Sequence, residues 1–226
     1  MRPLIIMNGE KIDWFHTVIR MLMYLAGVAV LALGMSLQTA SGLGVAALTC
    51  FATTLSMLTG KTLGFWIAAT FVAYIVAQFT ILRREFQPRI LLELCFSTLI
   101  GGFTDFFMAV NPLHPAALPI QVETMLLSLA VTAFGVSLVV NMGVVPNAPD
   151  GLVQVIAEKI KRRFGDVKVV FDCSHVAVSL VLSLALMHNL GGFGVTTAIS
   201  ALFLGHVINI ANKLFAQRFV RAAFGK

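Results

Sequence analysis

The positively charged residues of this chain are distributed very unevenly around its apolar stretches. Six stretches are long enough to cross a bilayer, each near the ~20 residues that span ~30 Å of hydrocarbon; they are residues 19–40, 62–82, 90–110, 121–142, 169–188 and 193–213. With a cytoplasmic N-terminus, Lys61 is the only one of the 16 Lys and Arg residues that falls outside. Because cytoplasmic loops are enriched in Lys and Arg, the sequence predicts a six-span protein with both termini in the cytoplasm.

Two further segments, residues 42–60 and 146–164, must not cross the bilayer if this charge distribution is to hold. If residues 42–60 crossed, Arg83, Arg84 and Arg89 would face outward. We therefore expect each segment to form a broken or re-entrant half-helix. Such segments are tolerated only where protein or a wet cavity covers their free backbone groups.

The composition supports a membrane location and argues against a soluble domain. The chain is 58% hydrophobic and 12% charged, with a mean hydropathy of +0.92. Its net charge of +6 is explained by cytoplasmic loops that face anionic lipid headgroups, so we expect membrane lipids and not nucleic acid as partners. Cys50, Cys95 and Cys173 share no metal-type spacing and are expected to be buried thiols. No metal or cofactor is predicted.

The first and second halves of the chain resemble each other. A shift of 101 residues places Ala-Leu-Gly-Met-Ser-Leu at 32–37 on Ala-Phe-Gly-Val-Ser-Leu at 133–138, and Gly42 on Gly143. The first span of each half is thus expected to end in a glycine break. A shift of 104 superposes the third spans, with Ser97, Gly101 and Asp105 on Ala201, Gly205 and Asn209. Residues four apart share a helix face, so each set predicts a packing seam.

Each half has three crossings, and an odd number forces the second half to insert upside down. We therefore predict an all-α polytopic membrane protein with six transmembrane helices in two inverted three-helix repeats. The predicted regions are an interfacial N-terminus (1–18), the first repeat (19–110), the second repeat (121–213) and a basic cytoplasmic tail (214–226).

Several motifs, mainly in the second half, resemble those of a known family. They are Asn-Ala-Pro-Asp-Gly-Leu at 147–152, the basic linker 161–168 leading into Val-Phe-Asp at 170–172, and the segment 194–205. Together they resemble the YczE/YyaS/YitT family of bacterial membrane proteins over nearly the whole chain. The resemblance implies a bacterial inner or plasma membrane location and a transport role, without a defined substrate. The first half departs from it, with Ala47 and Thr49 where the family often has Pro and Asp.

Ionisable residues inside hydrocarbon are candidate site residues, because a charge there costs about 2.5 kcal/mol or more. Asp172 and His175 share one helix face and could exchange a proton near neutral pH. Alternatively, Asp172 pairs with Lys168 or Arg163 at the interface. Asp105 is interpreted either as a proton or cation site or as a cap for a neighbouring helix end, a role that Asn209 could fill without charge.

Other polar residues have both a structural and a functional interpretation. Asn147 and Asp150 precede an amphipathic helix, where they either cap its first turn or recognise a polar substrate beside the helix dipole. Gln38 is a candidate uncharged substrate contact, or else a buried amide that supports helix association. For His206 we expect an interhelical hydrogen bond in preference to ligation, although it stays a candidate.

These observations favour a secondary transporter that moves a small cationic, zwitterionic or proton-coupled metabolite by alternating access. A polar cavity is expected between the halves, walled by residues 147–151 and by Asp172 with His175. The alternative is a non-transporting membrane scaffold for assembly or secretion. No Ser-His-Asp or paired-carboxylate spacing suggests an enzyme, and a homo-oligomer is left open.

Overall fold

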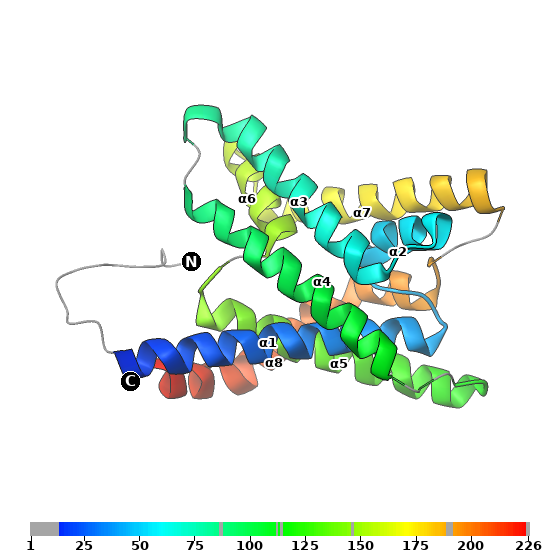
Figure 1. Cartoon of the computed structure of the whole chain (residues 1–226), viewed down its shortest axis with the longest axis horizontal. Helices are drawn as coiled ribbons and strands as arrows, with labels where there is room; N and C mark the ends of the chain where they lie inside the picture. The colour runs from blue at the N-terminus through cyan, green and yellow to red at the C-terminus, as the bar shows by residue number, and fades with distance from the viewer. Residues whose placement is uncertain are drawn as a thin grey trace.

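The computed structural model describes residues 14–85, 88–111, 113, 115–145, 147–188 and 192–224, and in these residues it contains helices and no strand (Figure 1). The helices are α1 (Trp14–Ser41), α2 (Ala47–Thr59), α3 (Leu63–Leu82), α4 (Leu92–Val110), α5 (Leu118–Met142), α6 (Ala148–Ile160), α7 (Phe164–Leu182) and α8 (Val195–Phe224). The short turns η1 (Arg83–Glu85) and η2 (Pro88–Leu91) lie between α3 and α4, and the π-helical turn η3 (Ser183–Met187) extends α7.

Six of these helices are long and apolar enough to cross a membrane: α1, α3, α4, α5, α7 with η3, and α8. The prediction of six apolar spans is thereby confirmed. The two remaining helices, α2 and α6, have 13 residues each and at 1.5 Å per residue measure about 20 Å, too short to cross alone. The order long, short, long, long therefore occurs twice along the chain. Residues 214–224, which belong to the predicted basic tail, continue α8 as helix.

Glycine ends the first long helix of each half, as predicted. Gly42 follows α1 with φ 72°, and Gly143 follows α5 with φ 55°. Both backbones are left-handed, a conformation that glycine adopts without a Cβ penalty. The backbone freed by the first break is covered by side chains, because Ala46 N donates to Gln38 Oε1 at 3.0 Å and Ala47 N donates to the Ser200 hydroxyl at 3.2 Å.

α1 crosses α5 through two close glycine contacts. A Cβ placed on Gly34 would lie 2.3 Å from Thr132 Oγ1, and one placed on Gly135 would lie 2.6 Å from Leu31 N. The two contacts are reciprocal, since Thr132 and Gly135 each follow their counterparts Leu31 and Gly34 by 101 residues. The predicted superposition of 32–37 on 133–138 therefore has a physical counterpart in this crossing.

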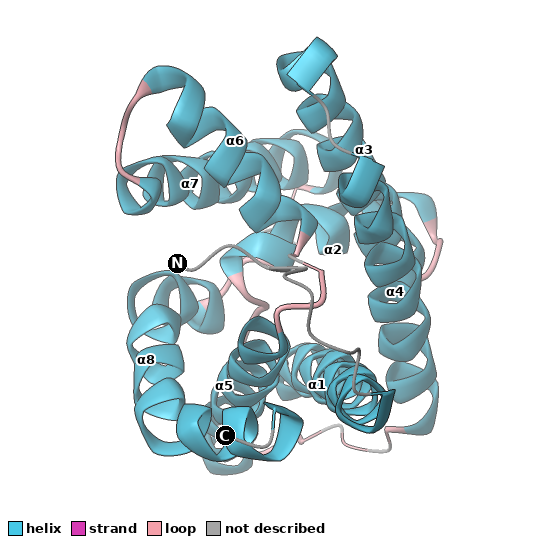
Figure 2. Cartoon of the chain, turned by 90° about the vertical axis from the view of Figure 1, so that its left-hand side faces the viewer, coloured by secondary structure: helices cyan, strands magenta, loops and turns pink. Residues whose placement is uncertain are grey.

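The other helices pack around this pair in a partly repeated way. α4 lies against α1 and α8 against α5, while α2 packs on α7 and α6 packs on α3. One pair breaks the pattern. α3 lies along α4 over much of its length, whereas in the described residues α7 and α8 make at most a marginal contact (Figure 2).

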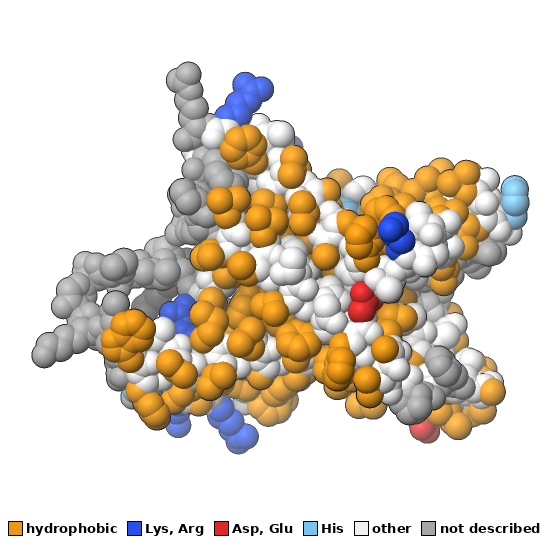
Figure 3. Space-filling view, viewed as in Figure 1, with side chains coloured by type: hydrophobic (Ala, Val, Ile, Leu, Met, Phe, Trp, Pro, Cys, Tyr) orange, Lys and Arg blue, Asp and Glu red, His pale blue; other side chains and the backbone are white. Residues whose placement is uncertain are grey.

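The flanks of the molecule are apolar (Figure 3). Val76 on α3, Val170 on α7 and Leu202 on α8 are 56%, 69% and 69% exposed. A soluble monomer rarely exposes apolar surface on this scale, and lipid is the solvent that suits it. The start of α1, the end of α3 and the end of α8 lie at the same end of the molecule (Figure 1).

Candidate functional site

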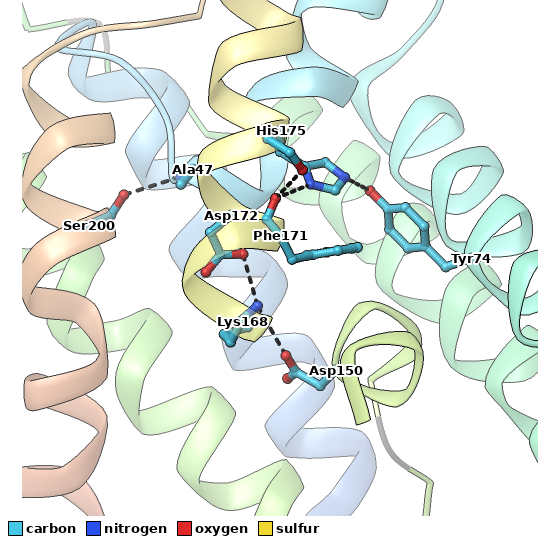
Figure 4. Close-up of polar contacts among 9 residues, drawn as sticks. Ala47, Tyr74, Asp150, Lys168, Phe171, Asp172, His175 and Ser200 are labelled. Carbon is cyan, nitrogen blue, oxygen red and sulfur yellow. Dashed lines mark hydrogen bonds and ion pairs between the residues drawn. The ribbon is translucent and has the colours of Figure 1, made fainter. Parts of the chain in front are cut away.

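A lysine joins the start of α6 to α7 through two carboxylates. Lys168 Nζ lies 3.1 Å from Asp150 Oδ1 and 3.0 Å from Asp172 Oδ1 (Figure 4). Asp150 is in the first turn of α6, and Asp172 is one turn beyond Lys168 on α7. The structure thus brings together two predicted site residues through an amine that the predicted site did not contain. Of the two interpretations of Asp172, pairing with Lys168 is the one observed.

His175 lies one turn beyond Asp172 and contacts the first half of the chain. Its Nδ1 is 2.8 Å from the carbonyl oxygen of Phe171, and its Nε2 is 2.5 Å from the hydroxyl of Tyr74 on α3. Since a carbonyl can only accept, Nδ1 carries a proton, and in the neutral ring Nε2 then accepts from the Tyr74 hydroxyl. The Phe171 ring bridges His175 and Lys168, with its centroid 4.3 Å from the His175 ring centroid and 5.8 Å from Lys168 Nζ.

A groove of about 380 Å³ opens beside His175, between α2 and α3 of the first half and α7 of the second. Its walls are largely apolar and aromatic, formed by Phe51, Leu55, Trp66, Ala69, Thr70, Ala73, Tyr74, Ser174, His175 and Val178. The expected polar cavity, walled by residues 147–151 and by Asp172 with His175, differs from this groove, because His175 is the one residue of that set among its lining residues. The ion pairs lie next to it and not in its walls.

A second carboxylate site lies under the start of α6. Glu93, in the first turn of α4, is 1% exposed, and its Oε2 accepts a 2.7 Å hydrogen bond from Gln78 Nε2. The same nitrogen lies 3.3 Å from the carbonyl oxygen of Ala148. A Cβ on Gly151 would come within 2.8 Å of Glu93 Oε1. Three helices therefore meet at Glu93, and a side chain at position 151 would fill the space beside it.

The start of α2 is surrounded by uncharged polar groups. Gln38 is fully buried; it accepts from Ala46 N, and its Nε2 donates to the Thr132 hydroxyl at 3.2 Å. The hydroxyl of Thr197 donates to the carbonyl of Val45 at 2.7 Å. Gln38 thus satisfies the broken backbone after α1, in line with the structural alternative for this residue.

Three further predicted site residues lie away from these groups. Asp105 caps the start of α3, because its Oδ1 accepts from Gly64 N and its Oδ2 accepts from the Thr62 hydroxyl, both at 2.7 Å. His206 and Asn209, on α8, are exposed on the apolar flank. A Cβ on Gly205 would meet nothing within 4 Å, so the seam expected on α8 makes no contact.

Two expectations about local chemistry are corrected. Asn147 precedes α6 as its N-cap residue, but its side chain makes no capping hydrogen bond and its Oδ1 is buried without a partner. Cys50 is buried as expected, whereas Cys95 and Cys173 are exposed, because they lie on the outer faces of α4 and α7. In the described residues no group of three or more His, Cys, Asp or Glu side chains is arranged to hold a metal.

Sequence reasoning missed Glu93, Tyr74 and the central position of Lys168. Glu93 falls in the predicted span 90–110, so the rule applied to Asp105 could have found it. Lys168 was assigned to a cytoplasmic linker, because α7 begins five residues earlier than the predicted span. Tyr74 carried no signal, since a phenol in an apolar helix is ordinary.

The comparison with protein families identifies the chain at a coarse level. A family of unknown function, DUF6198, matches residues 18–213. The chain belongs to this family. Neither the search of curated proteins nor the search of solved structures gave a match. The match covers all the residues of the two carboxylate sites, and the naming as YczE/YyaS/YitT stays a prediction.

Proposed function

We propose that this DUF6198 member is a secondary transporter of a small polar metabolite, working by alternating access of two inverted halves. The observation that carries the proposal is the ion-paired group of Asp150, Lys168 and Asp172, which joins a short non-spanning helix to a spanning helix beside a groove between the halves. In known transporters, substrates bind near such discontinuous helices at the interface of the repeats.

Repeated contacts support the inverted relation of the halves. Besides the reciprocal crossing of α1 and α5, the Ser36 hydroxyl accepts from Asn111 Nδ2 at 3.3 Å, and the Ser137 hydroxyl donates to Asn212 Oδ1 at 2.5 Å. Asn212 follows Asn111 by 101 residues, the same shift that relates Ser137 to Ser36. These contacts therefore relate the last helices of the two halves by the same 101 residues as the first helices. The sequence comparison had given 104 residues for the third spans.

The charges of the site favour a zwitterionic substrate. Lys168 shares its positive charge between two carboxylates, so a substrate amine can take one carboxylate while a substrate carboxylate takes the amine of Lys168. The aromatic walls formed by Phe51, Trp66 and Tyr74 suit an apolar substituent on the same molecule. A substrate without charge would leave these half-buried ion pairs unchanged and gain little from them.

Exchange of radiolabelled amino acids and amines across proteoliposomes tests the proposal. We expect Lys168→Gln and Asp172→Asn to lose the exchange that the parent shows. Lys159→Gln is the matched control, because Lys159 forms a 2.6 Å pair with Glu85 at the exposed end of α6. Parent-like exchange by Lys168→Gln would refute the site. Folded protein that exchanges no member of the panel would favour the scaffold alternative.

A further inference from the structure

Glu93 is held in a setting that suits an uncharged carboxyl group. It is 1% exposed, as is its hydrogen-bond partner Gln78. Gln78 Nε2 is the one donor that it meets among the described residues, at 2.7 Å. A carboxylate removed from water needs a cation or several donors to offset its desolvation. A single neutral amide does not supply this.

Within the described part of the chain, the charged and titratable neighbours of Glu93 do not offset a negative charge either. Glu93 takes part in none of the ion pairs of the described residues. Asp150 faces it from α6 and Tyr24 faces it from α1, while Cys95 shares its helix. α3 contributes Gln78, which does not titrate. The like charge of Asp150 repels a negative Glu93. Both the burial of Glu93 and this repulsion therefore disfavour its negative form.

The side chains of Arg84 and Arg89, the cations closest to Glu93 in sequence, lie outside the described part. Arg20 on α1 is directed elsewhere, since its Nε and a terminal nitrogen donate to the carbonyls of Met142 and Gly143 at 2.6 and 2.7 Å. It caps the end of α5. Removing Arg20 would therefore affect α5 first and Glu93 only indirectly.

One turn of α6 contacts both carboxylate sites. Asp150 pairs with Lys168 on α7, and the next residue, Gly151, lies against Glu93 and Gln78. A Cβ on Gly151 would come 3.2 Å from the Gln78 amide and 2.8 Å from Glu93 Oε1. A change of charge on Glu93 therefore acts directly on the first turn of α6, which also holds Asp150.

We propose that Glu93 is a proton-binding site, that the proton binds at Oε1, and that its binding and release shift the start of α6. Oε2 keeps the Gln78 hydrogen bond while Oε1 gains the proton and becomes neutral and able to donate. The role of this proton as the coupling ion rests on the proposed transport function. The binding of the proton does not.

Labelling with dicyclohexylcarbodiimide tests the site without any knowledge of the substrate. This apolar reagent adds to a protonated carboxyl within the membrane and leaves a stable N-acylurea, whose mass identifies the residue. In purified parent protein we expect an adduct at Glu93 that is lost as the pH is raised above neutrality. Glu93→Gln removes the adduct, and the matched control Asp105→Asn keeps it. An adduct independent of pH, or protection by sodium at constant pH, would overturn the proton assignment.

Transport measurements then separate the two proposals. In proteoliposomes with a pH gradient, parent protein should accumulate substrate, and Glu93→Gln should exchange substrate without accumulating it. If Glu93→Gln still accumulates substrate, the coupling role is wrong and the transport function stands. If neither protein moves substrate while the parent shows pH-dependent labelling, the transport function fails and the proton site stands. The pH dependence of labelling is measured on the parent protein alone. Misfolding of Glu93→Gln would therefore not change the test of the proton site.

Discussion

Asp105 uses both oxygens of its carboxylate to hold the start of α3. One accepts from the backbone of Gly64 and the other from the hydroxyl of Thr62, which itself accepts from Phe65 N as the N-cap of α3. An acceptor at a helix start satisfies a free N–H group and complements the positive end of the helix dipole. The position of Asp105 is therefore explained by the stability of α3.

Replacement of Asp105 separates the capping role from a role in ion binding. We expect Asp105→Asn to stay close to the parent, because an amide oxygen can still accept from Gly64 N. Asp105→Ala should lower the free energy of unfolding by about 1–3 kcal/mol, because it leaves Gly64 N and the Thr62 hydroxyl without their acceptor. Melting in detergent measures both. A loss in Asp105→Asn as large as in Asp105→Ala would show that the charge itself is needed.

At the residue scale the sequence predicted which residues lie close together better than it predicted the contacts between them. Asp150, Asp172 and His175 do lie together around Lys168 and Phe171. Their grouping was foreseeable, because α6 and α7 are joined by a short linker. The pairing of Asp172 was predicted with Lys168 or Arg163 and not with Lys168 alone, since a helix start cannot be placed to within one turn from hydropathy alone.

At the scale of elements, a seam of glycines joins α3 to α4. A Cβ on Gly101 would lie 2.5 Å from the carbonyl oxygen of Gly64, and one on Gly64 would lie 2.0 Å from that of Gly101. The two backbones are thus in direct contact, as the spacing of Ser97, Gly101 and Asp105 predicted for the first half. In the second half Gly205 faces open space, because α8 is separated from α7.

Two neighbouring glycines of α4 provide a matched test of this seam. We expect Gly101→Ala to lower the free energy of unfolding by about 1–3 kcal/mol, because the added methyl group must push the two backbones apart. Gly102→Ala should be neutral or raise it by up to about 1 kcal/mol, because a Cβ there meets nothing and alanine is the better helix former. Equal melting temperatures for the two variants would refute the seam.

The positions of most helices could be predicted from the sequence, because hydropathy and charge distribution depend on whole helices and not on single contacts. Spans were placed to within a few residues for α3, α4 and α5, and the two short helices lie in the two segments excluded from crossing. The extension of α8 to Phe224 was missed, because Arg218 and Arg221 were assigned to a basic tail beyond a span that ends at Lys213. They end the apolar stretch and not the helix.

At the scale of the whole molecule, the basic ends of the spanning helices are expected to lie on one side of the membrane. The start of α1, the end of α3 and the end of α8 share one end of the structure, and in Figure 3 most of the visible Lys and Arg side chains lie toward that end. This arrangement agrees with the unequal charge distribution in the sequence. It agrees with a common side for the start of α1 and the end of α8, and the cytoplasmic orientation of that side stays a prediction.

Labelling of single cysteines in intact cells checks this topology. After replacement of Cys50, Cys95 and Cys173, a cysteine at position 61 should react with an impermeant maleimide in intact cells. One at position 84 should react only after permeabilisation. Labelling of position 84 in intact cells would contradict the six-span arrangement.

The unequal packing of the two halves has a consequence for the resting state. In the proposed cycle the halves exchange conformations, so α3 and α4 must separate while α7 and α8 come together. Gly64 and Gly101 would lose their close backbone contact, and no comparably tight seam is present around Gly205 to replace it. The resting population is then biased toward the arrangement seen here. In the proposed cycle substrate and proton together have to overcome this bias, and a bias of 99 to 1, for example, would take about 5.5 kcal/mol of preferential binding to reverse.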